Sequence, residues 1–170
     1  MTAKHFSDVY QYNDWANRRL WQCLEVVPDE IYFQDRDFSV GSLHEQVMHI
    51  VGVERWWLGY LITGEVILNT DEDRERLRNR TALRAWWDDI TARNLAYIAS
   101  LTADELLRQV KPFFWDDDDP TISVGHALTQ VTQHSLDHRA QTMTLLHQLG
   151  YEGTDQEYLT FLRERTADNA

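Results

Sequence analysis

Apolar residues recur at intervals of three and four along most of the chain, the spacing of one face of an α-helix. Four long segments carry this pattern: residues 3–27, 42–63, 81–101 and 123–150. Pro28, Gly64 and Gly150 stand at their ends, where helices commonly stop. With 170 residues the chain can bury one good core. The pattern predicts an all-α protein, a four-helix bundle forming one domain over residues 1–170.

Local signals set the ends and inner faces of these helices. Ser42 and Glu45 have the spacing of a capping box, and Thr102 and Glu105 predict a short extra turn. Residues 111–120 predict a loop, and residues 156–165 a short tail helix packed outside the bundle. The predicted inner face of the first helix is Phe6, Tyr10, Asn13, Asn17, Leu20, Leu24 and Val27. That of the third is Leu83, Trp87, Ile90, Asn94 and either Tyr97 or Ile98. That of the fourth is Val124, Leu128, Val131, His134, His138, Thr142, Leu145 and Leu149.

Charge and composition narrow the function. The net charge of −12 repels phosphate backbones and anionic lipids, so we expect no nucleic-acid or membrane partner. No apolar run approaches the ~20 residues that span a bilayer, and the N-terminus has no signal-peptide core, so we expect a cytoplasmic protein. Cys23 is the only cysteine, which excludes an intrachain disulfide and a thiolate-rich zinc site.

The candidate chemistry is a histidine pair, His134 and His138, four residues apart on the fourth predicted helix. This spacing places both rings on one helix face. Imidazoles in an apolar stripe need a compensating partner, and a divalent metal held with a third ligand would supply one. His49, on the second predicted helix, is our candidate for that ligand. The alternative is that these are core histidines bonded to backbone carbonyls.

Other histidines fit the site less well. His44 lies about 140° around the helix from His49, and its place in the first turn favours a surface role. His126 lies about 12 Å along the helix from His134, too far to share an ion. His5 and His147 are expected in solvent. The spacing resembles the metalloprotease motif His-Glu-x-x-His, but Ser135 stands where the catalytic glutamate is required.

The aspartates, the tryptophan pairs and the cysteine are expected to have structural roles. Asp137 is expected at the surface or behind the ligands, and residues 116–119, four aspartates, read as a solvated loop without EF-hand spacing. Of each tryptophan pair, 56–57 and 86–87, one member is expected in the core and the other at a pocket or subunit interface. Cys23 is expected to be a small core residue. Tyr12, Trp56 and Gln141 are pocket candidates from helical phase.

In order and spacing, three motifs resemble the DinB family. They are YNDWAN at 12–17, GSL at 41–43 followed by His49 and Ile50, and HSLDHRAQ at 134–141. The resemblance implies an up-down-down-up four-helix bundle, usually a homodimer, with a metal site that maps onto His49, His134 and His138. Ala140 departs from the glycine that many members have there, a change compatible with a helix.

Characterised relatives use the metal to bind a low-molecular-weight thiol, such as bacillithiol, mycothiol or glutathione. The resemblance therefore implies a metal-dependent transferase that activates a thiol for attack on an electrophilic small molecule. Two alternatives stay open: a hydrolase using activated water, and a non-enzymatic stress-response dimer that only binds metal. Three imidazoles suit zinc or nickel best, with iron, cobalt or manganese as further candidates.

Overall fold

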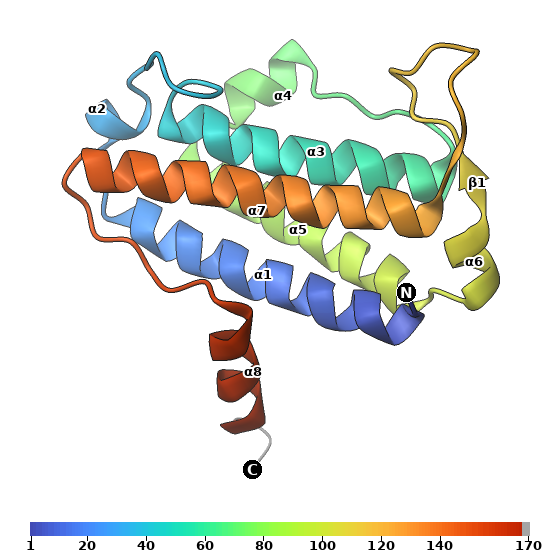
Figure 1. The fold of residues 1–170 in the computed structure, drawn as a ribbon. Helices are drawn as coiled ribbons and strands as arrows, with labels where there is room; N and C mark the ends of the chain where they lie inside the picture. Colours follow the sequence, from blue (N-terminus) through green and yellow to red (C-terminus); the bar gives the residue numbers. More distant parts are fainter. Residues whose placement is uncertain (168–170) are drawn as a thin grey trace.

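A computed structural model describes residues 1–167, in which four long helices form a bundle. They are α1 (Ala3–Glu25), α3 (Leu43–Thr63), α5 (Arg80–Ala99) and α7 (Val124–Gln148). α1 and α3 each pack against both α5 and α7. In Figure 1, α1 and α7 run in one direction along the bundle, and α3 and α5 run in the opposite direction. The predicted all-α, up-down-down-up architecture is confirmed.

Side-chain caps explain where the long helices begin. Ser42 Oγ accepts a hydrogen bond from the backbone N–H of Glu45 at 3.1 Å, and Ser123 Oγ accepts one from His126 at 3.2 Å. Such bonds satisfy N–H groups that a helix leaves unpaired at its start. α3 ends at Gly64, whose φ of 77° lies in the left-handed region that glycine favours. The predicted boundaries of the four helices fall within two residues of the observed ones.

Short elements join the long helices. α2 (Asp29–Tyr32) and α4 (Asp71–Arg76) were not expected from the pattern, because neither contains enough turns to show a period. α6 (Ala103–Leu107) is the extra turn predicted after Thr102. Two antiparallel strands, β1 (Gln109–Val110) and β2 (Ile122–Ser123), bracket the predicted loop. α8 (Tyr158–Ala167) extends away from the bundle in Figure 1.

The connection from α3 to α5 crosses the length of the bundle, because these two helices run in parallel. Residues 64–70 return along α3 toward α4, as Figure 1 shows. Arg55 on α3 donates a hydrogen bond to Asn69, and its guanidinium lies 3.7 Å from the Asp73 carboxylate. Leu77, just after α4, is completely buried. These contacts hold the crossover against one side of α3.

The apolar core consists of two clusters, one toward each end of the bundle. One contains Phe6 and Tyr10 of α1 with Val124 to Val131 of α7, and the other contains Leu20 and Leu24 with Leu145 and Leu146. The level between them is polar. Its buried side chains are Asn13, Asn17, Glu54, Asn94, Ser135, Arg139 and Thr142. The interior therefore has a polar layer halfway along the helices.

Two predictions about burial were wrong. The tryptophan pair 86–87 does not divide between core and pocket, because both indoles are buried. On α7 the middle of the buried face is Ser135 and Arg139, while His134 and His138 are half-buried beside it. These positions differ by one residue, about 100° around the helix.

No described helix has the length and hydropathy needed to cross a membrane.

The expected surface position of His44 was also wrong. α2 covers it, and the rings of Tyr32 and Phe33 lie 5.8 and 4.9 Å from the imidazole centroid. This burial lowers the His44 pKa to about 4 from 6.5, and the nearby Arg78 charge adds to the effect. The imidazole therefore stays neutral in the folded protein at pH values where the unfolded chain binds a proton.

We predict that the protein loses stability in acid, because the unfolded chain binds a proton at His44 more readily than the folded protein does. A folded-state pKa near 4 corresponds to roughly 3 kcal/mol of stability that is complete above pH 6.5 and lost as the pH falls toward 4. Urea unfolding of metal-free wild type and His44→Phe at pH 7.5, 5.5 and 4.5 measures it. The wild type should lose more stability than the variant, and parallel losses would contradict the prediction.

Candidate metal centre

The histidine cluster lies between α3 and α7, which pack side by side in antiparallel directions. His49 projects from the second turn of α3, and His134 and His138 come from consecutive turns of α7. The ring centroid of His49 lies 4.8 Å from that of His134 and 4.3 Å from that of His138. His134 and His138 are 4.4 Å apart. The structure thus brings together the three histidines that the sequence singled out.

The donor atoms of the cluster suit a divalent cation. One ring nitrogen from each histidine lies within 4.8 Å of the others, and the Nε2 atoms of His49 and His134 are 2.9 Å apart. Within residues 1–167, no other group of His, Cys, Asp or Glu side chains is arranged to hold an ion. Three neutral nitrogen donors can hold a divalent metal ion, with ligand positions left for a further molecule.

Burial keeps the cluster neutral. It lowers the pKa of all three imidazoles, and for His134 the neighbouring histidines add to the effect and bring the value to about 4. The charge of Asp137 acts in the opposite direction on His138. Metal ligation requires the unprotonated imidazole. All three rings therefore offer lone pairs at neutral pH.

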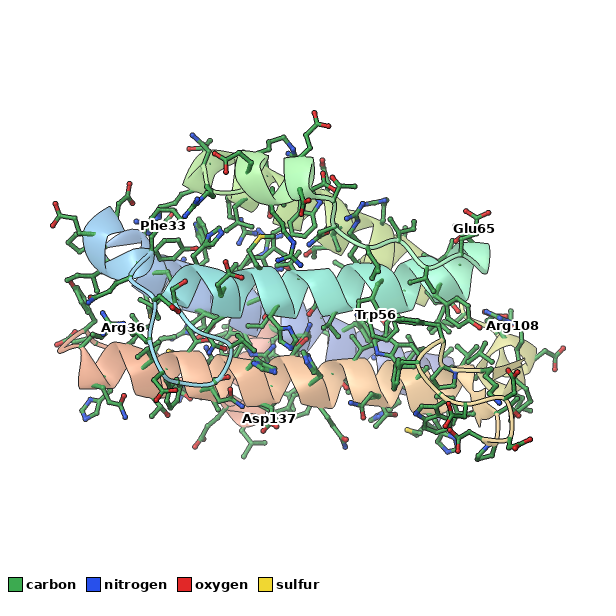
Figure 2. The ribbon with its side chains drawn as sticks, turned by 90° about the horizontal axis from the view of Figure 1, so that it is seen from above. Phe33, Arg36, Trp56, Glu65, Arg108 and Asp137 are labelled. Carbon is green, nitrogen blue, oxygen red and sulfur yellow. The ribbon has the colours of Figure 1, made fainter. Side chains whose placement is uncertain are left out.

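Gln46 fixes the orientation of one ring. Its side chain is completely buried, and Oε1 lies 3.2 Å from Nδ1 of His138. An amide oxygen only accepts hydrogen bonds, so Nδ1 carries the proton and Nε2 keeps its lone pair. Hydrogen bonds of this kind set the tautomer and direction of metal-binding histidines. Asp137 has no such role, since Figure 2 shows it on the side of α7 away from α3.

A buried ionic network lies on the other side of the histidines, in the polar layer. Glu54 Oε1 accepts hydrogen bonds from Asn13 Nδ2 and Ser135 Oγ, each at 2.7 Å, and from Asn17 Nδ2 at 3.3 Å. Arg139 donates to the amide oxygens of the same two asparagines. Ser135 and Arg139 each follow a histidine of the cluster. The network therefore fixes how α7 is turned about its own axis relative to α1 and α3.

The network counters the cost of burying its two charges. Burial raises the pKa of Glu54, while the hydrogen bonds from Ser135 and Asn13 and the Arg139 charge oppose that rise. Burial likewise lowers the pKa of Arg139, against the pull of Tyr12 and Glu54. We did not predict Glu54 from the sequence. Its signal was a carboxylate within the apolar run from Ile50 to Leu61 of α3, together with two asparagines on the apolar stripe of α1.

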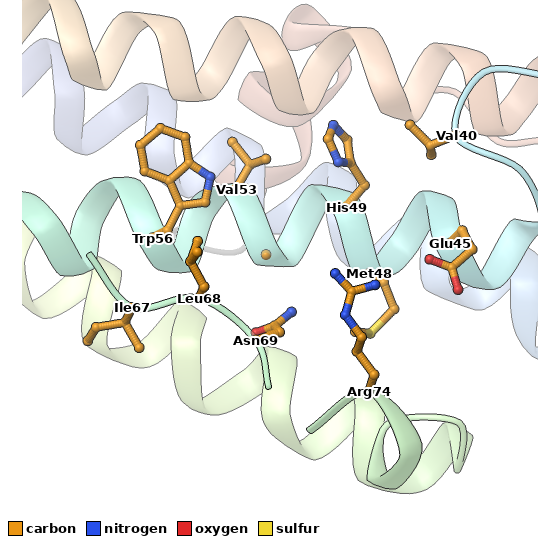
Figure 3. A pocket seen from close by; sticks show the side chains of 11 residues that line it. Val40, Glu45, Met48, His49, Val53, Trp56, Ile67, Leu68, Asn69 and Arg74 are labelled. Atoms are coloured by element: carbon orange, nitrogen blue, oxygen red, sulfur yellow. The ribbon is translucent and has the colours of Figure 1, made fainter. Parts of the chain in front are cut away.

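A cavity of about 360 Å³ opens beside the cluster, on the flank of α3 (Figure 3). We call it the flank cavity. His49, Val53 and Trp56 line one edge of it, and Asn69 and Arg74 of the crossover line the other edge, across α3 in this view. The remaining lining residues are Val40, Glu45, Met48, Gly52, Ile67 and Leu68. Its wall therefore combines apolar surface with one cation, one carboxylate and one amide.

The remaining candidates take other places. His126 is exposed and lies outside the cluster, and His5 and His147 are exposed as predicted. Tyr12 contacts the tail through a 2.7 Å hydrogen bond to Gln156 O, and Gln141 bonds Ser39, so neither lines a cavity at the cluster. Cys23 is half-buried beside the core, with its pKa raised by burial. The aspartates at 116–119 are exposed.

Fold and site together define a helical-bundle protein with three converging histidines between two antiparallel helices. Comparison with known proteins agrees with that class. The model of the DinB family matches residues 1–168, and the chain belongs to this family. It is similar to Protein DinB of Bacillus subtilis (strain 168), with 26% identity over 160 residues that cover 91% of each chain.

Proposed function

We propose that His49, His134 and His138 bind a divalent metal, and that the protein is a transferase which joins a low-molecular-weight thiol to an electrophilic small molecule. The observation that carries the proposal is the convergence of three neutral imidazoles beside open cavities. A bound divalent ion lowers the pKa of a thiol that reaches it and so supplies thiolate at neutral pH. No protein cysteine stands at the cluster among residues 1–167.

The polar lining of the flank cavity supports the choice of a thiol. Glutathione and bacillithiol carry carboxylates together with amino or amide groups, and Arg74, Glu45 and Asn69 offer complementary groups within one cavity. Arg74 belongs to the crossover and His49 to α3, so a thiol whose carboxylate pairs with Arg74 would have its sulfur end free to reach toward His49. Such positioning raises the effective concentration of the nucleophile at the reacting carbon.

The proposed reaction is a substitution. The sulfur forms a bond to carbon, the leaving group departs with the electron pair of its former bond, and the thiol proton passes to solvent. The residues of this chain bind and orient the two reactants. Cytoplasmic location and homodimer formation remain predictions from the sequence.

A turnover assay tests the proposal. Metal-loaded protein is mixed with glutathione or bacillithiol and 1-chloro-2,4-dinitrobenzene, and thioether formation is followed by absorbance. Turnover should disappear with a chelator. Arg74→Gln should raise KM for the thiol about tenfold through loss of a charged hydrogen bond. The matched variant Arg76→Gln should not, because Arg76 pairs with Asp73 and does not line the cavity.

Two results would contradict the thiol mechanism. One is the absence of metal-dependent turnover with every thiol. The other is hydrolysis of 4-nitrophenyl acetate that needs the metal and no thiol, which would assign the site to water activation instead.

A further inference from the structure

A second hollow, of about 630 Å³, opens on the other side of His49, between α3, α7 and the loop 111–121. We call it the aromatic hollow. His49 and His134 both form part of its wall, and it shares Val53 and Trp56 with the flank cavity. The rest of its wall is Trp57, Pro112, Phe114, Trp115, Ile122, His126 and Gln130. His49 therefore borders two cavities of different character, and His134 borders one of them.

Aromatic rings build most of this wall and support one another. The indoles of Trp56 and Trp57 are stacked with centroids 4.5 Å apart. Phe114, from the loop, meets both edge-on at 5.8 and 6.1 Å. Phe113 packs edge-on against Trp56 at 4.9 Å and braces it from outside the hollow. Rings held this way present faces and edges that favour another aromatic ring.

The wall of the aromatic hollow carries no Asp, Glu, Lys or Arg side chain. This is notable in a chain of net charge −12, with four aspartates immediately after Trp115. Lys111 does not reach into it, because its Nζ donates to the carbonyl oxygens of Asp117 and Asp119 at 2.6 and 2.8 Å. An ion that enters the hollow would lose part of its hydration shell and gain no charged side chain in exchange. A neutral molecule does not pay this desolvation cost.

The polar groups of the hollow form a line along α7. His126, Gln130 and His134 are spaced four residues apart, so they share one helix face at successive turns. The first two can exchange hydrogen bonds with a polar group of a bound molecule, and the third belongs to the cluster. A molecule bound along this line lies with one end at the histidines.

We propose that the aromatic hollow binds a neutral, flat aromatic molecule, with its rings against Trp56 and Phe114 and a hydrogen-bonding group at His126 or Gln130. The identification of this molecule as the electrophile rests on the proposed function. Its binding does not, since none of these contacts involves a metal. The thiol and the aromatic molecule would then approach the histidines from opposite sides of His49.

A pair of fluorescent probes tests the inference. N-phenyl-1-naphthylamine is neutral, and 8-anilinonaphthalene-1-sulfonate is the same ring system with one added negative charge. Fluorescence titration of both chelated and metal-loaded protein should show saturable binding of the neutral probe. In the chelated protein the sulfonate should bind at least about tenfold more weakly, because its charge then has no partner in the wall.

A matched pair of variants locates the binding. Gln130→Trp fills the hollow from an exposed position of α7, and Gln133→Trp places the same side chain on the same helix outside it. The first should weaken binding of the neutral probe about tenfold or more, and the second should leave it within about twofold. Circular dichroism and metal content, compared with wild type, show that helix and cluster are intact.

Three results would overturn the inference: equal binding in both variants, sulfonate binding to the chelated protein as tight as that of the neutral probe, or no binding because a second copy of the chain covers the hollow. If a second copy covers the hollow, the neutral probe should bind only after the protein is diluted until it is monomeric. If the neutral probe binds but no thiol is turned over, the proposed function is refuted, and the inference that the aromatic hollow binds a neutral aromatic molecule still stands.

Discussion

Replacing Glu54 with leucine is expected to lower the free energy of unfolding by about 3 to 5 kcal/mol, because the change leaves the buried Arg139 guanidinium without its counter-charge. Both side chains are almost completely inaccessible to solvent, and the Nδ2 donors of the two asparagines between them lose their acceptor on Glu54. Urea unfolding at pH 7.5, followed by circular dichroism, measures the loss.

A double-mutant cycle controls this prediction. Arg139→Met alone should be similarly destabilising, and the double variant Glu54→Leu with Arg139→Met should recover part of the loss, since two apolar groups leave no stranded charge. Additive losses, or a loss below about 1 kcal/mol for Glu54→Leu, would show that the network contributes little to stability.

Removal of any one cluster histidine is expected to weaken metal binding on the order of a thousandfold. Structural zinc sites contribute about 10 to 16 kcal/mol, so each of three ligands accounts for several kcal/mol. Calorimetric titration of zinc into chelated His49→Ala, His134→Ala and His138→Ala measures this. Gln46→Leu should lie between these variants and wild type, with a loss of about 10-fold to 100-fold, because it releases the His138 ring without removing a ligand.

His126→Ala and His147→Ala provide the matched controls, since both change a histidine of α7 outside the cluster. Their zinc affinity should equal that of wild type. The helix content of the cluster variants should also be retained, because the buried network faces away from the histidines. Unchanged zinc binding in His138→Ala would contradict the three-histidine site.

Long-range periodicity explains what could be predicted from the sequence. Helices of 20 residues or more repeat their apolar spacing often enough to reveal their extent and inner face. Capping side chains such as Ser42 and Ser123 then set the starts. The convergence of His134 and His138 follows from one helix, and that of His49 from the antiparallel packing of its neighbour. These features depend on local chemistry and on a simple bundle.

Other features depend on three-dimensional packing that no local pattern records. The burial of His44 requires α2, which is too short to be recognised by periodicity. The role of Glu54 requires asparagines from α1 and Ser135 from α7 to meet at one level of the bundle. The aromatic hollow requires the loop 111–121 to return against Trp56. In each case distant segments supply the environment that gives the residue its role.

The parallel course of α3 and α5 also bears on how relatives of this protein can diverge. The three histidines stand on bundle helices, whereas the crossover and the loop 111–121 supply walls that face them. Insertions and substitutions in such surface segments are tolerated far better than changes in a packed interior. The linings of the two cavities can thus change separately during evolution, one through each segment, while the histidine cluster beside them is inherited intact.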